Sequence, residues 1–496
     1  MTDNTSIQEI DNLLAKAQEA FFIFKNYTVK QRAAAMHKIA DVIEALGDEL
    51  ITTANAETNL PVARLQGEKG RTISQWRGYA DALASGIVLP VRIDSALPDR
   101  TPLPRPSIRK TYTPLGPVVV FCASNFPFAF STAGGDTASA IAAGCPVIVK
   151  AHSAHPKTSG IMAGAITKAI ADAGLPEGLF GHVYSNSFEN GTYLVSHHTI
   201  KAVGFTGSYG GGKALIDLSN KREEPIPVFA EMGSVNPVFL LEKKLNNAAE
   251  EVAKQYAASL TLGVGQFCTN PGIFIAPESP ALATFINTLA EQIAATPAAA
   301  MLHKGIAKAY HTNKSSVLAQ PNVDTVAQAT EGAEGTGNAA IAITTAEAFL
   351  ANKQMAQEVF GPFGLLVTYK SADEAIAIAK AIEGQLTISI LGEEDELAAN
   401  SALINAVTVK CGRLLFNNFP TGVEVCYAMQ HSGPYPACSD SRFTAVGPDA
   451  IKRFARPVSY QNWPDAVLPE ELKNENTLGI WRTVNGELTK ENLVIS

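Results

Sequence analysis

A cysteine in a glycine-rich segment is the residue whose chemistry stands out first. Cys268 lies in the run Gly-Val-Gly-Gln-Phe-Cys-Thr-Asn-Pro-Gly over residues 263–272. Glycine and proline on both sides favour a turn, so we expect the thiol to be presented on a loop and not buried in a helix or strand. Such a thiol acts as a nucleophile only where a neighbouring group lowers its pKa or removes its proton. Taken alone, Cys268 is more simply interpreted as an inert thiol, so its chemical partners must come from other segments.

The composition favours a large enzyme that acts on a small molecule. The chain has 496 residues, of which 46% are hydrophobic and 17% charged, values typical of a globular protein with two or three domains. Its net charge is −8 and its basic residues are scattered, which argues against nucleic-acid and membrane partners. The six cysteines include no Cys-x-x-Cys pair, which argues against disulfides and a thiolate zinc site. We recognise no signal peptide and no membrane span, and expect a cytoplasmic protein.

Apolar runs that alternate with helical segments predict the fold class. The first 90 or so residues keep a helical period, and strand-like runs begin near residue 110. This alternation is typical of an α/β fold with a largely parallel sheet. Connecting helices are expected at 131–143 and 157–173, and a second α/β unit over 247–404, with a helix at 394–402.

Four predicted strands lead directly to residues that can bind or react. The strands at 117–122, 147–149, 202–205 and 226–229 are followed by Asn125, Lys150, the turn Thr206-Gly207-Ser208, and Glu231. The carboxyl ends of parallel strands meet at one edge of a sheet, where ligands bind. The sequence therefore predicts that an amide, an ammonium group, a glycine-containing turn and a carboxylate share one site.

Six short segments, in this order, resemble the motifs of the aldehyde dehydrogenase superfamily. They are Ser124–Pro127, Val149-Lys150, Phe205–Ser208, Glu231–Gly233, Gly265–Cys268 and Glu358–Pro362. Within that superfamily, residues 151–156, 433–436 and 478–482 resemble the α-ketoglutaric semialdehyde (2,5-dioxovalerate) dehydrogenase branch. The same branch includes NADP-dependent long-chain aldehyde dehydrogenases.

The resemblance implies a domain arrangement and an assembly. A Rossmann-type NAD(P)-binding domain is expected over 1–228, with a small β oligomerisation arm at about 92–113. A catalytic α/β domain with Cys268 follows over 229–425, and 426–496 is expected to return with a substrate-side loop and an oligomerisation tail. The exposed strand edges of such an arm need a partner chain, so a homodimer or a dimer of dimers is expected.

The resemblance also implies an NAD(P)-dependent oxidation of an aldehyde to a carboxylic acid. Cys268 would attack the aldehyde, giving a thiohemiacetal and then a thioester. Asn125 and the Cys268 backbone N–H would stabilise the oxyanion, and Glu231 would be the general base for thioester hydrolysis. A catalytically silent dinucleotide-binding or structural family member is the alternative from a different class, and the presence of all three residues argues against it.

Cofactor contacts are implied in the same way. Lys150 would reach the adenosine ribose, Gly207 and Ser208 the pyrophosphate, Glu358 the nicotinamide ribose and Phe360 the nicotinamide. Ser153 stands where many NAD-using members carry glutamate, whose carboxylate would repel a 2′-phosphate. Use of both NAD and NADP is therefore expected, with the preference open. His152 and His155 lack further ligands nearby and are interpreted as structural, so no metal site is expected.

The substrate expected from the resemblance is α-ketoglutaric semialdehyde, which would yield 2-oxoglutarate. A medium-chain or long-chain aliphatic aldehyde is the alternative. The carboxylate of the semialdehyde needs a cation, and Arg71, with Gln75 one turn later, is the candidate. Arg71 is equally well explained as a salt-bridge residue. Cys438, in the loop after residues 433–436, is a third candidate near the substrate.

Overall fold

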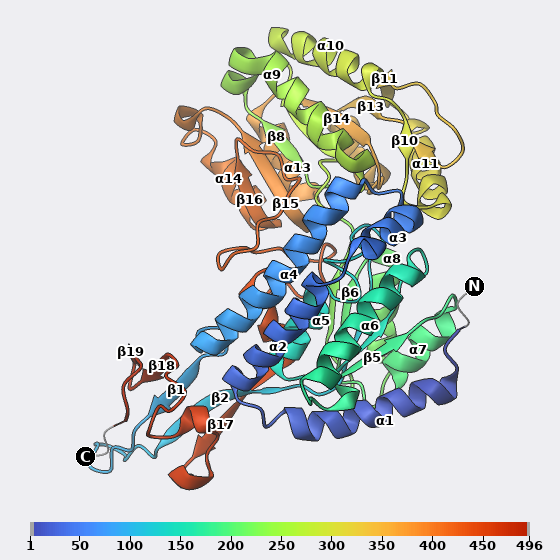
Figure 1. The fold of residues 1–496 in the computed structure, drawn as a ribbon. Coiled ribbons are helices and arrows are strands. Elements are labelled where there is room, and N and C mark those ends of the chain that lie inside the picture. Colours follow the sequence, from blue (N-terminus) through green and yellow to red (C-terminus); the bar gives the residue numbers. More distant parts are fainter. Residues whose placement is uncertain (1–3, 494–496) are drawn as a thin grey trace.

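The structure is a computed structural model that describes residues 4–493. It has two lobes and a protruding arm (Figure 1). The described chain begins with the helices α1 (Ile7–Phe24), α2 (Val29–Glu44), α3 (Asp48–Thr58) and α4 (Val62–Ser85). Ser6 and Thr28 are the N-caps of α1 and α2, each in a capping box that satisfies free N–H groups. The predicted helical N-terminal region is confirmed.

The lower lobe contains a five-stranded parallel sheet in the order β5-β4-β3-β6-β7. Its strands are β3 (Val118–Phe121), β4 (Val147–Lys150), β5 (Phe180–Val183), β6 (Ala202–Thr206) and β7 (Val228–Glu231). The helices between them are α5 (Gly135–Ala143), α6 (Pro156–Asp172), α7 (Phe188–Ser196) and α8 (Tyr209–Asn220), with the short η1 (Glu177–Leu179) before β5. The strand order reverses between β3 and β6, which is where ligands bind in such sheets.

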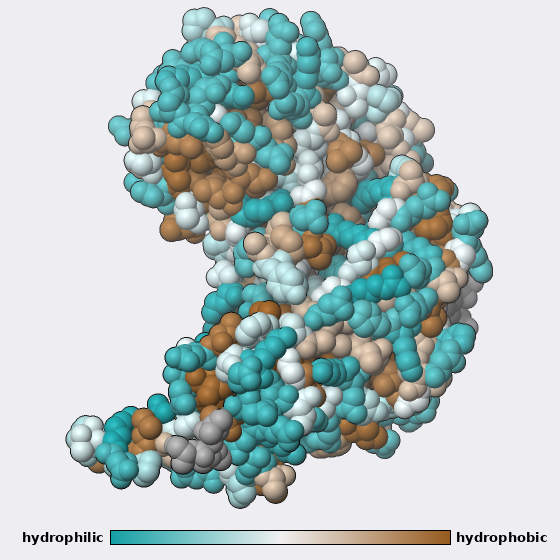
Figure 2. Space-filling view, turned by 60° about the vertical axis from the view of Figure 1, so that its left-hand side comes forward, coloured by the Kyte–Doolittle hydropathy of each residue, from teal (hydrophilic) through white to brown (hydrophobic). Residues whose placement is uncertain are grey.

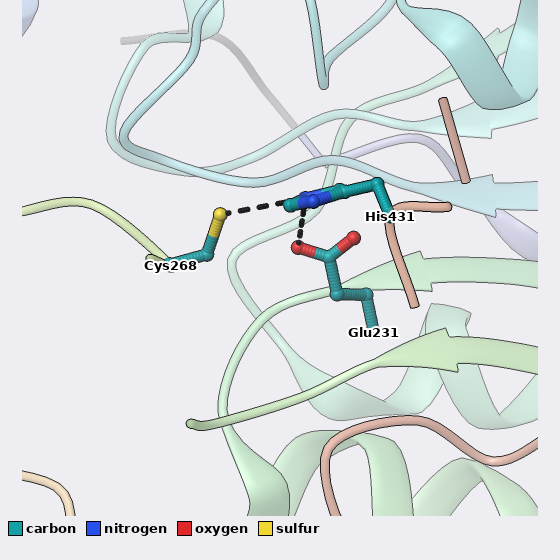
Figure 3. Close-up of side chains that lie close together, drawn as sticks. All are labelled: Glu231, Cys268 and His431. Carbon is teal, nitrogen blue, oxygen red and sulfur yellow. Dashed lines mark hydrogen bonds and ion pairs between the residues drawn. The ribbon is translucent and has the colours of Figure 1, made fainter. Parts of the chain in front are cut away.

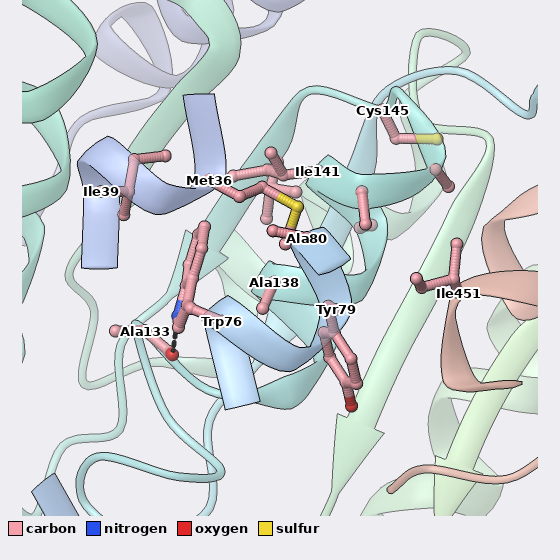
Figure 4. Packing of buried hydrophobic residues seen from close by; sticks show 14 of the residues in the cluster. Met36, Ile39, Trp76, Tyr79, Ala80, Ala133, Ala138, Ile141, Cys145 and Ile451 are labelled. Atoms are coloured by element: carbon pink, nitrogen blue, oxygen red, sulfur yellow. Dashed lines mark hydrogen bonds between the residues drawn. The ribbon is translucent and has the colours of Figure 1, made fainter. Parts of the chain in front are cut away.

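The helices α2, α4 and α5 form one packed layer against this sheet (Figure 4). Trp76 and Tyr79 of α4 share one hydrophobic cluster with Ile39 of α2 and Ile141 of α5, and all four side chains are fully buried. Burial of each such side chain stabilises the fold by roughly 1.5–3 kcal/mol. The Trp76 indole also donates a 2.7 Å hydrogen bond to the Ala133 carbonyl. Helix α4 is thereby fixed beside the loop that follows β3.

The upper lobe contains a seven-stranded sheet in the order β11-β13-β14-β9-β8-β15-β16, parallel except for the β11–β13 pair. Its strands are β8 (Val238–Leu240), β9 (Ile273–Pro277), β11 (Asp324–Gln328), β13 (Ala340–Thr345), β14 (Phe363–Tyr369), β15 (Gln385–Leu391) and β16 (Cys411–Phe416). Its helices are α9 (Glu242–Thr261), α10 (Pro280–Ala295), α11 (Lys304–Leu318), α12 (Ala346–Ala351), α13 (Ala372–Ala381) and α14 (Ser401–Thr408). The α/β fold class is confirmed in both lobes. The first sheet ends with β7, so the boundary between the sheets lies at 232–237, slightly beyond the predicted 228.

The helix predicted at 394–402 is wrong. The structure has a 3-10 turn, η4 (Glu394–Glu396), and the helix α14 begins only at Ser401. The Glu396 carboxylate turns back to accept hydrogen bonds from the N–H groups of Glu393, at 2.9 Å, and Lys243, at 2.8 Å. These bonds start a helical turn, which is interrupted at Asn400. The φ and ψ angles of Asn400 are −99° and 17°, and its side-chain amide donates a 2.9 Å hydrogen bond to the Glu396 carbonyl.

The arm is a separate five-stranded sheet in the order β17-β2-β1-β18-β19 (Figure 1). It is formed by β1 (Val91–Asp94), β2 (Ile108–Pro114), β17 (Ala455–Gln461), β18 (Arg482–Val484) and β19 (Glu487–Thr489). The predicted arm and the C-terminal segment therefore lie in one sheet. The remaining short elements are η2 (Leu262–Gly265), β10 (Ala299–Ala300), β12 (Thr336–Gly337), η3 (Lys353–Ala356), η5 (Pro448–Phe454), η6 (Asp465–Val467) and η7 (Glu470–Leu472). Within residues 4–493, none of the helices is both long enough and apolar enough to span a bilayer.

Candidate active site

A cavity of about 800 Å³ brings together residues of both lobes. That volume lies in the range of about 300–1,000 Å³ that is typical of small-molecule sites. Nine residues singled out from the sequence line it: Asn125, Lys150, Ser153, Gly207, Ser208, Glu231, Cys268, Glu358 and Phe360. The residues that the strand-end argument grouped, namely Asn125, Lys150, Gly207, Ser208 and Glu231, therefore do line one cavity.

Cys268 lies on a loop whose backbone requires glycine. After α9, the chain has positive φ angles of 55° at Gly263, 58° at Val264 and 65° at Gly265. A Cβ at Gly265 would also collide with the backbone of Gly361. Asn270 fixes the same contact, because its amide donates a 3.1 Å hydrogen bond to the Gly361 carbonyl. The nucleophile loop is therefore closely packed against the segment that follows Glu358.

Asn236 holds the loop from its other side. It is fully buried and has a φ of 45°, and its amide donates hydrogen bonds of 2.9 Å to the Cys268 carbonyl and 3.0 Å to the Asn270 carbonyl. Gln385 of β15 accepts hydrogen bonds from the backbone N–H groups of Val235, at 2.9 Å, and Asn236, at 3.0 Å. The connection between β7 and β8 is thereby fixed beneath Cys268.

Three side chains converge at the sulfur atom (Figure 3). The Nε2 atom of His431 lies 3.6 Å from the Cys268 Sγ atom and 3.1 Å from the Glu231 Oε1 atom. The reactive atoms of the three residues all lie within 4.8 Å of one another. Oε2 of Glu231 is buried and has no hydrogen-bond partner within the described chain. Cys268 itself is partly exposed, whereas Glu231 and His431 are buried.

The electrostatics of this group keep the thiol protonated at rest. Burial, together with the negative charge of Glu231, raises the pKa of Cys268 well above its ordinary value. Burial would also raise the pKa of Glu231, but the charge of His431 and hydrogen bonds from His431 and Cys268 outweigh it, so this pKa lies below the usual value. An ionised carboxylate therefore lies beside a neutral thiol.

Asn125 lies next to the nucleophile loop, and Arg64 of α4 connects the two. The Asn125 amide donates a 3.2 Å hydrogen bond to the Gln266 carbonyl, and Arg64 donates a 2.8 Å hydrogen bond to the Asn125 carbonyl. The Arg64 guanidinium also lies over the rings of Phe126, at 5.1 Å, and Phe267, at 4.8 Å. These cation–π contacts hold the Asn125 segment against the Cys268 segment.

The other end of the cavity is formed by the ends of β4 and β6. Lys150 ends β4, and burial lowers the pKa of its ammonium group. Ser208 is the N-cap of α8, where its hydroxyl accepts a hydrogen bond from the Gly211 N–H. Burial raises the pKa of Glu358 to about 7, although a backbone hydrogen bond from Ser234 opposes the shift. His152 and His155 stack at 5.5 Å, and His155 Nε2 lies 3.0 Å from the Ala123 carbonyl oxygen.

The three substrate candidates do not line this cavity. Gln75 is buried and donates a 2.7 Å hydrogen bond to the Tyr79 hydroxyl, so its amide is already engaged. Cys438 is 6% exposed, pairs with Glu231 in an isolated β-bridge, and packs beside Cys268. Arg71 lies over the Phe130 ring at 5.9 Å, and its buried Nε and Nη2 atoms have no hydrogen-bond partner in residues 4–493.

Comparisons with known proteins show the family of the chain. The family model described as "Aldehyde dehydrogenase family" matches residues 2–433. The chain belongs to the aldehyde dehydrogenase family. "Alpha-ketoglutaric semialdehyde dehydrogenase 2" of Azospirillum brasilense is 47% identical over 97% of this chain and 91% of its own length. "Alpha-ketoglutaric semialdehyde dehydrogenase" of Acinetobacter baylyi is 43% identical over 98% of this chain and 92% of its own length.

Solved structures of other aldehyde dehydrogenases share the fold. A succinic semialdehyde dehydrogenase from Streptococcus pyogenes, in complex with NADP+, superimposes with a TM-score of 0.76 at 17% identity, covering 93% of this chain and 96% of that one. A 1-pyrroline-5-carboxylate dehydrogenase gives a TM-score of 0.76 at 19% identity, covering 93% and 87%. As a family member, the chain is an oxidoreductase that acts on aldehydes with NAD(P).

His431 and Asn236 are the site residues that the sequence analysis of this aldehyde dehydrogenase missed. His431 lies 163 positions after Cys268, in a segment without regular secondary structure. The available signal was the Pro- and Gly-rich composition of that segment, which is typical of functional loops. Asn236 gives no such signal, because its role depends on a left-handed backbone that only the folded structure shows.

Proposed function

We propose that this aldehyde dehydrogenase oxidises α-ketoglutaric semialdehyde to 2-oxoglutarate. The observation that carries the proposal is the pair of relatives with that name, which are 47% and 43% identical over nearly the whole chain. Arg71 supports it from within the structure. A substrate carboxylate removed from water needs a cation, and a guanidinium with unused N–H groups can bind it through two hydrogen bonds.

The position of Arg71 suits this role. Its guanidinium lies 5.9 Å from the Phe130 ring, and the same ring lies 6.3 Å from the ring of His431, which contacts Cys268. The Phe130 ring is therefore a neighbour of both the Arg71 guanidinium and the His431 imidazole. Arg71 forms no ion pair within residues 4–493, so the alternative assignment to a salt bridge has no partner there.

In the proposed mechanism, Cys268 is the nucleophile. Its sulfur electron pair forms a bond to the aldehyde carbon, the carbonyl electron pair moves to oxygen, and the thiol proton passes to Glu231. The Asn125 amide and the Cys268 backbone N–H stabilise the resulting oxyanion. NAD(P), when bound, supplies the two-electron acceptor that converts the thiohemiacetal carbon to a thioester. After Glu231 has released the thiol proton to solvent, its carboxylate accepts a proton from the water that attacks the thioester. The C–S bond then breaks, the carboxylic acid leaves, and the sulfur of Cys268 takes up a proton again.

The residues around the cavity fit a dinucleotide. The N-terminus of α8, capped by Ser208, suits the negative charge of a pyrophosphate. Lys150, Glu358 and Phe360 also line the cavity. In this proposal Lys150 would hold the adenosine ribose, Glu358 the nicotinamide ribose, and Phe360 would pack near the nicotinamide. Ser153 lines the cavity and carries no charge that would repel a 2′-phosphate, so either NAD or NADP is proposed as the cofactor.

We also propose that the chain forms a homodimer or a dimer of dimers. β16 is an edge strand, and its Leu414 and Phe416 are 39% and 40% exposed. Hydrophobic surface gathers on this side of the upper lobe (Figure 2). Edge strands with exposed apolar side chains are unfavourable in water, so a second copy whose arm covers β16 would stabilise the assembly.

The substrate is tested by measuring reduced cofactor with α-ketoglutaric semialdehyde and with hexanal, each with NAD+ and with NADP+. We expect higher kcat/KM with the semialdehyde, and Arg71→Met should raise its KM about tenfold while leaving hexanal oxidation nearly unchanged. Arg71→Lys is the matched control that keeps the charge. A preference for hexanal would overturn the proposed substrate, and equal losses on both aldehydes would assign Arg71 to stability.

A further inference from the structure

His431 is buried, and its backbone is held by hydrogen bonds on both sides. Its side chain is 1% exposed. Its backbone N–H donates a 2.9 Å hydrogen bond to the Thr444 hydroxyl, and its carbonyl accepts a 2.9 Å hydrogen bond from the Ala445 N–H. The imidazole therefore has little freedom to leave Cys268 and Glu231 (Figure 3).

A single nitrogen of His431 faces both partners. Nε2 lies 3.1 Å from Glu231 Oε1 and 3.6 Å from Cys268 Sγ. An ionised carboxylate can only accept hydrogen bonds, so Nε2 must carry a hydrogen for this contact to be favourable. The same N–H is then directed between an oxygen and a sulfur. It cannot accept the thiol proton at that nitrogen, which excludes a simple Cys–His relay.

We infer that His431 is a positioning residue whose Nε2–H binds Glu231 Oε1 and stabilises the Cys268 thiolate as it forms. The Cys268 proton moves to the Glu231 carboxylate, and the sulfur electron pair becomes available for the C–S bond. The inference rests on the proposed function only in taking Cys268 as the nucleophile. No other member of the proposed catalytic set can donate a hydrogen bond to both the Glu231 carboxylate and the Cys268 sulfur. The amide of Asn125 donates to the Gln266 carbonyl instead.

The charges around the sulfur make such a donor necessary. Burial and Glu231 both oppose the thiolate, and Glu358 adds a second unfavourable charge. The positive charges of Arg71 on α4 and Arg413 on β16 favour the thiolate of Cys268. The titratable neighbours of Glu231 include Arg453 and Cys438. A hydrogen bond from a nearby N–H to a thiolate favours the ionised form and lowers the pKa of the thiol.

The test is the pH dependence of Cys268 alkylation by iodoacetamide, without substrate or cofactor. Cys426 is exposed and would also react, so all variants carry Cys426→Ser and labelling is followed on the Cys268 peptide by mass spectrometry. In His431→Leu the inflection should move up by about one pH unit, so that labelling near neutral pH slows about tenfold. His431→Gln, which keeps an N–H at a similar reach, should lose less than half of that effect.

An unchanged rate of Cys268 alkylation in His431→Leu would overturn the inference. Equally slow alkylation in the Gln and Leu variants would also overturn it, because it would mean that His431 carries a proton and does not act through a fixed N–H donor. If the Leu variant does not fold, His431→Asn, whose amide is one methylene shorter, replaces it in the comparison with Gln. Because iodoacetamide needs no aldehyde, failure of the proposed substrate would leave this result intact.

Discussion

At the residue scale, Ser153 is the residue that we propose to decide between NAD and NADP next to Lys150. Both side chains line the cavity, and neither Lys150 nor Ser153 contributes a negative charge. A carboxylate at position 153 would bind a ribose 2′-hydroxyl and repel a 2′-phosphate. Ser153→Glu should therefore raise the KM for NADP+ at least tenfold and leave that for NAD+ within a few-fold.

Steady-state kinetics with both cofactors, and Ser153→Ala as the matched control, measure this effect. The alanine variant removes the hydroxyl without adding charge, so it should change the two KM values similarly. An Ser153→Glu variant that uses NADP+ as well as the parent would show that the 2′-phosphate binds elsewhere.

At the scale of elements, the contact between the nucleophile loop and residues 358–362 depends on Gly265. This residue has a φ of 65°, and any side chain there meets the backbone of Gly361. Gly265→Ala should therefore destabilise the fold by about 1–3 kcal/mol and lower kcat more than tenfold, because Cys268 follows three residues later.

Gly67→Ala is the matched control for this prediction. Gly67 lies inside helix α4, and an added Cβ meets no atom within 4 Å. Alanine should stabilise that helix by up to about 1 kcal/mol, as chemical denaturation can measure. Full activity and stability of Gly265→Ala would mean that the loop can repack, and that its close approach is not required.

Helix α4 also carries a carboxylate whose protonation affects stability. Glu68 is 5% exposed and accepts hydrogen bonds from the N–H groups of Phe128, at 2.8 Å, and Ala129, at 3.0 Å. Burial raises the pKa of Glu68 from 4.5 to about 6, although these bonds oppose the shift. The folded state therefore binds this proton more tightly than the unfolded state does.

The resulting stabilisation is fully present below pH 4.5 and is lost as the pH rises through about 6. The shift corresponds to roughly 2 kcal/mol. Glu68→Gln keeps the acceptor oxygen but cannot titrate. The unfolding free energy of the parent, relative to this variant, should fall by roughly that amount between acidic and neutral pH. Parallel stability curves for the two proteins would contradict the assignment.

The sequence correctly predicted the α/β fold class, because it depends on the order of strands and helices along the chain. The sequence predicted a shared location for the residues that follow predicted strands, because parallel strands end at one edge of a sheet. These residues are Asn125, Lys150, Ser208 and Glu231. The helix at 394–402 was mispredicted because Asn400 leaves the helical conformation and its side chain binds the Glu396 carbonyl, which the periodicity of apolar residues does not show. His431 was missed because no periodicity fixes where a long loop places one side chain.

At the scale of the whole molecule, the arm and the exposed β16 edge give a prediction about assembly. Phe416→Lys places a charge on an apolar face that a partner chain is proposed to cover. It should shift the protein toward monomers at micromolar concentration, as mass photometry or light scattering would show. Leu350→Lys, at a residue 38% exposed on α12 in the same lobe, is the matched control and should leave the assembly unchanged. A stable, active monomer of the parent chain would remove the proposed interface.

The central claim is that Cys268 carries the substrate as a thioester, which Glu231 helps to hydrolyse. The direct measurement is the mass of the Cys268 peptide after Glu231→Gln is mixed with α-ketoglutaric semialdehyde and NAD(P)+ and quenched in acid. Glutamine keeps an oxygen for the His431 N–H but cannot accept the proton of water, so the acyl group should accumulate on Cys268 with one equivalent of reduced cofactor. Turnover at the parent rate with an unmodified Cys268 peptide would contradict the claim.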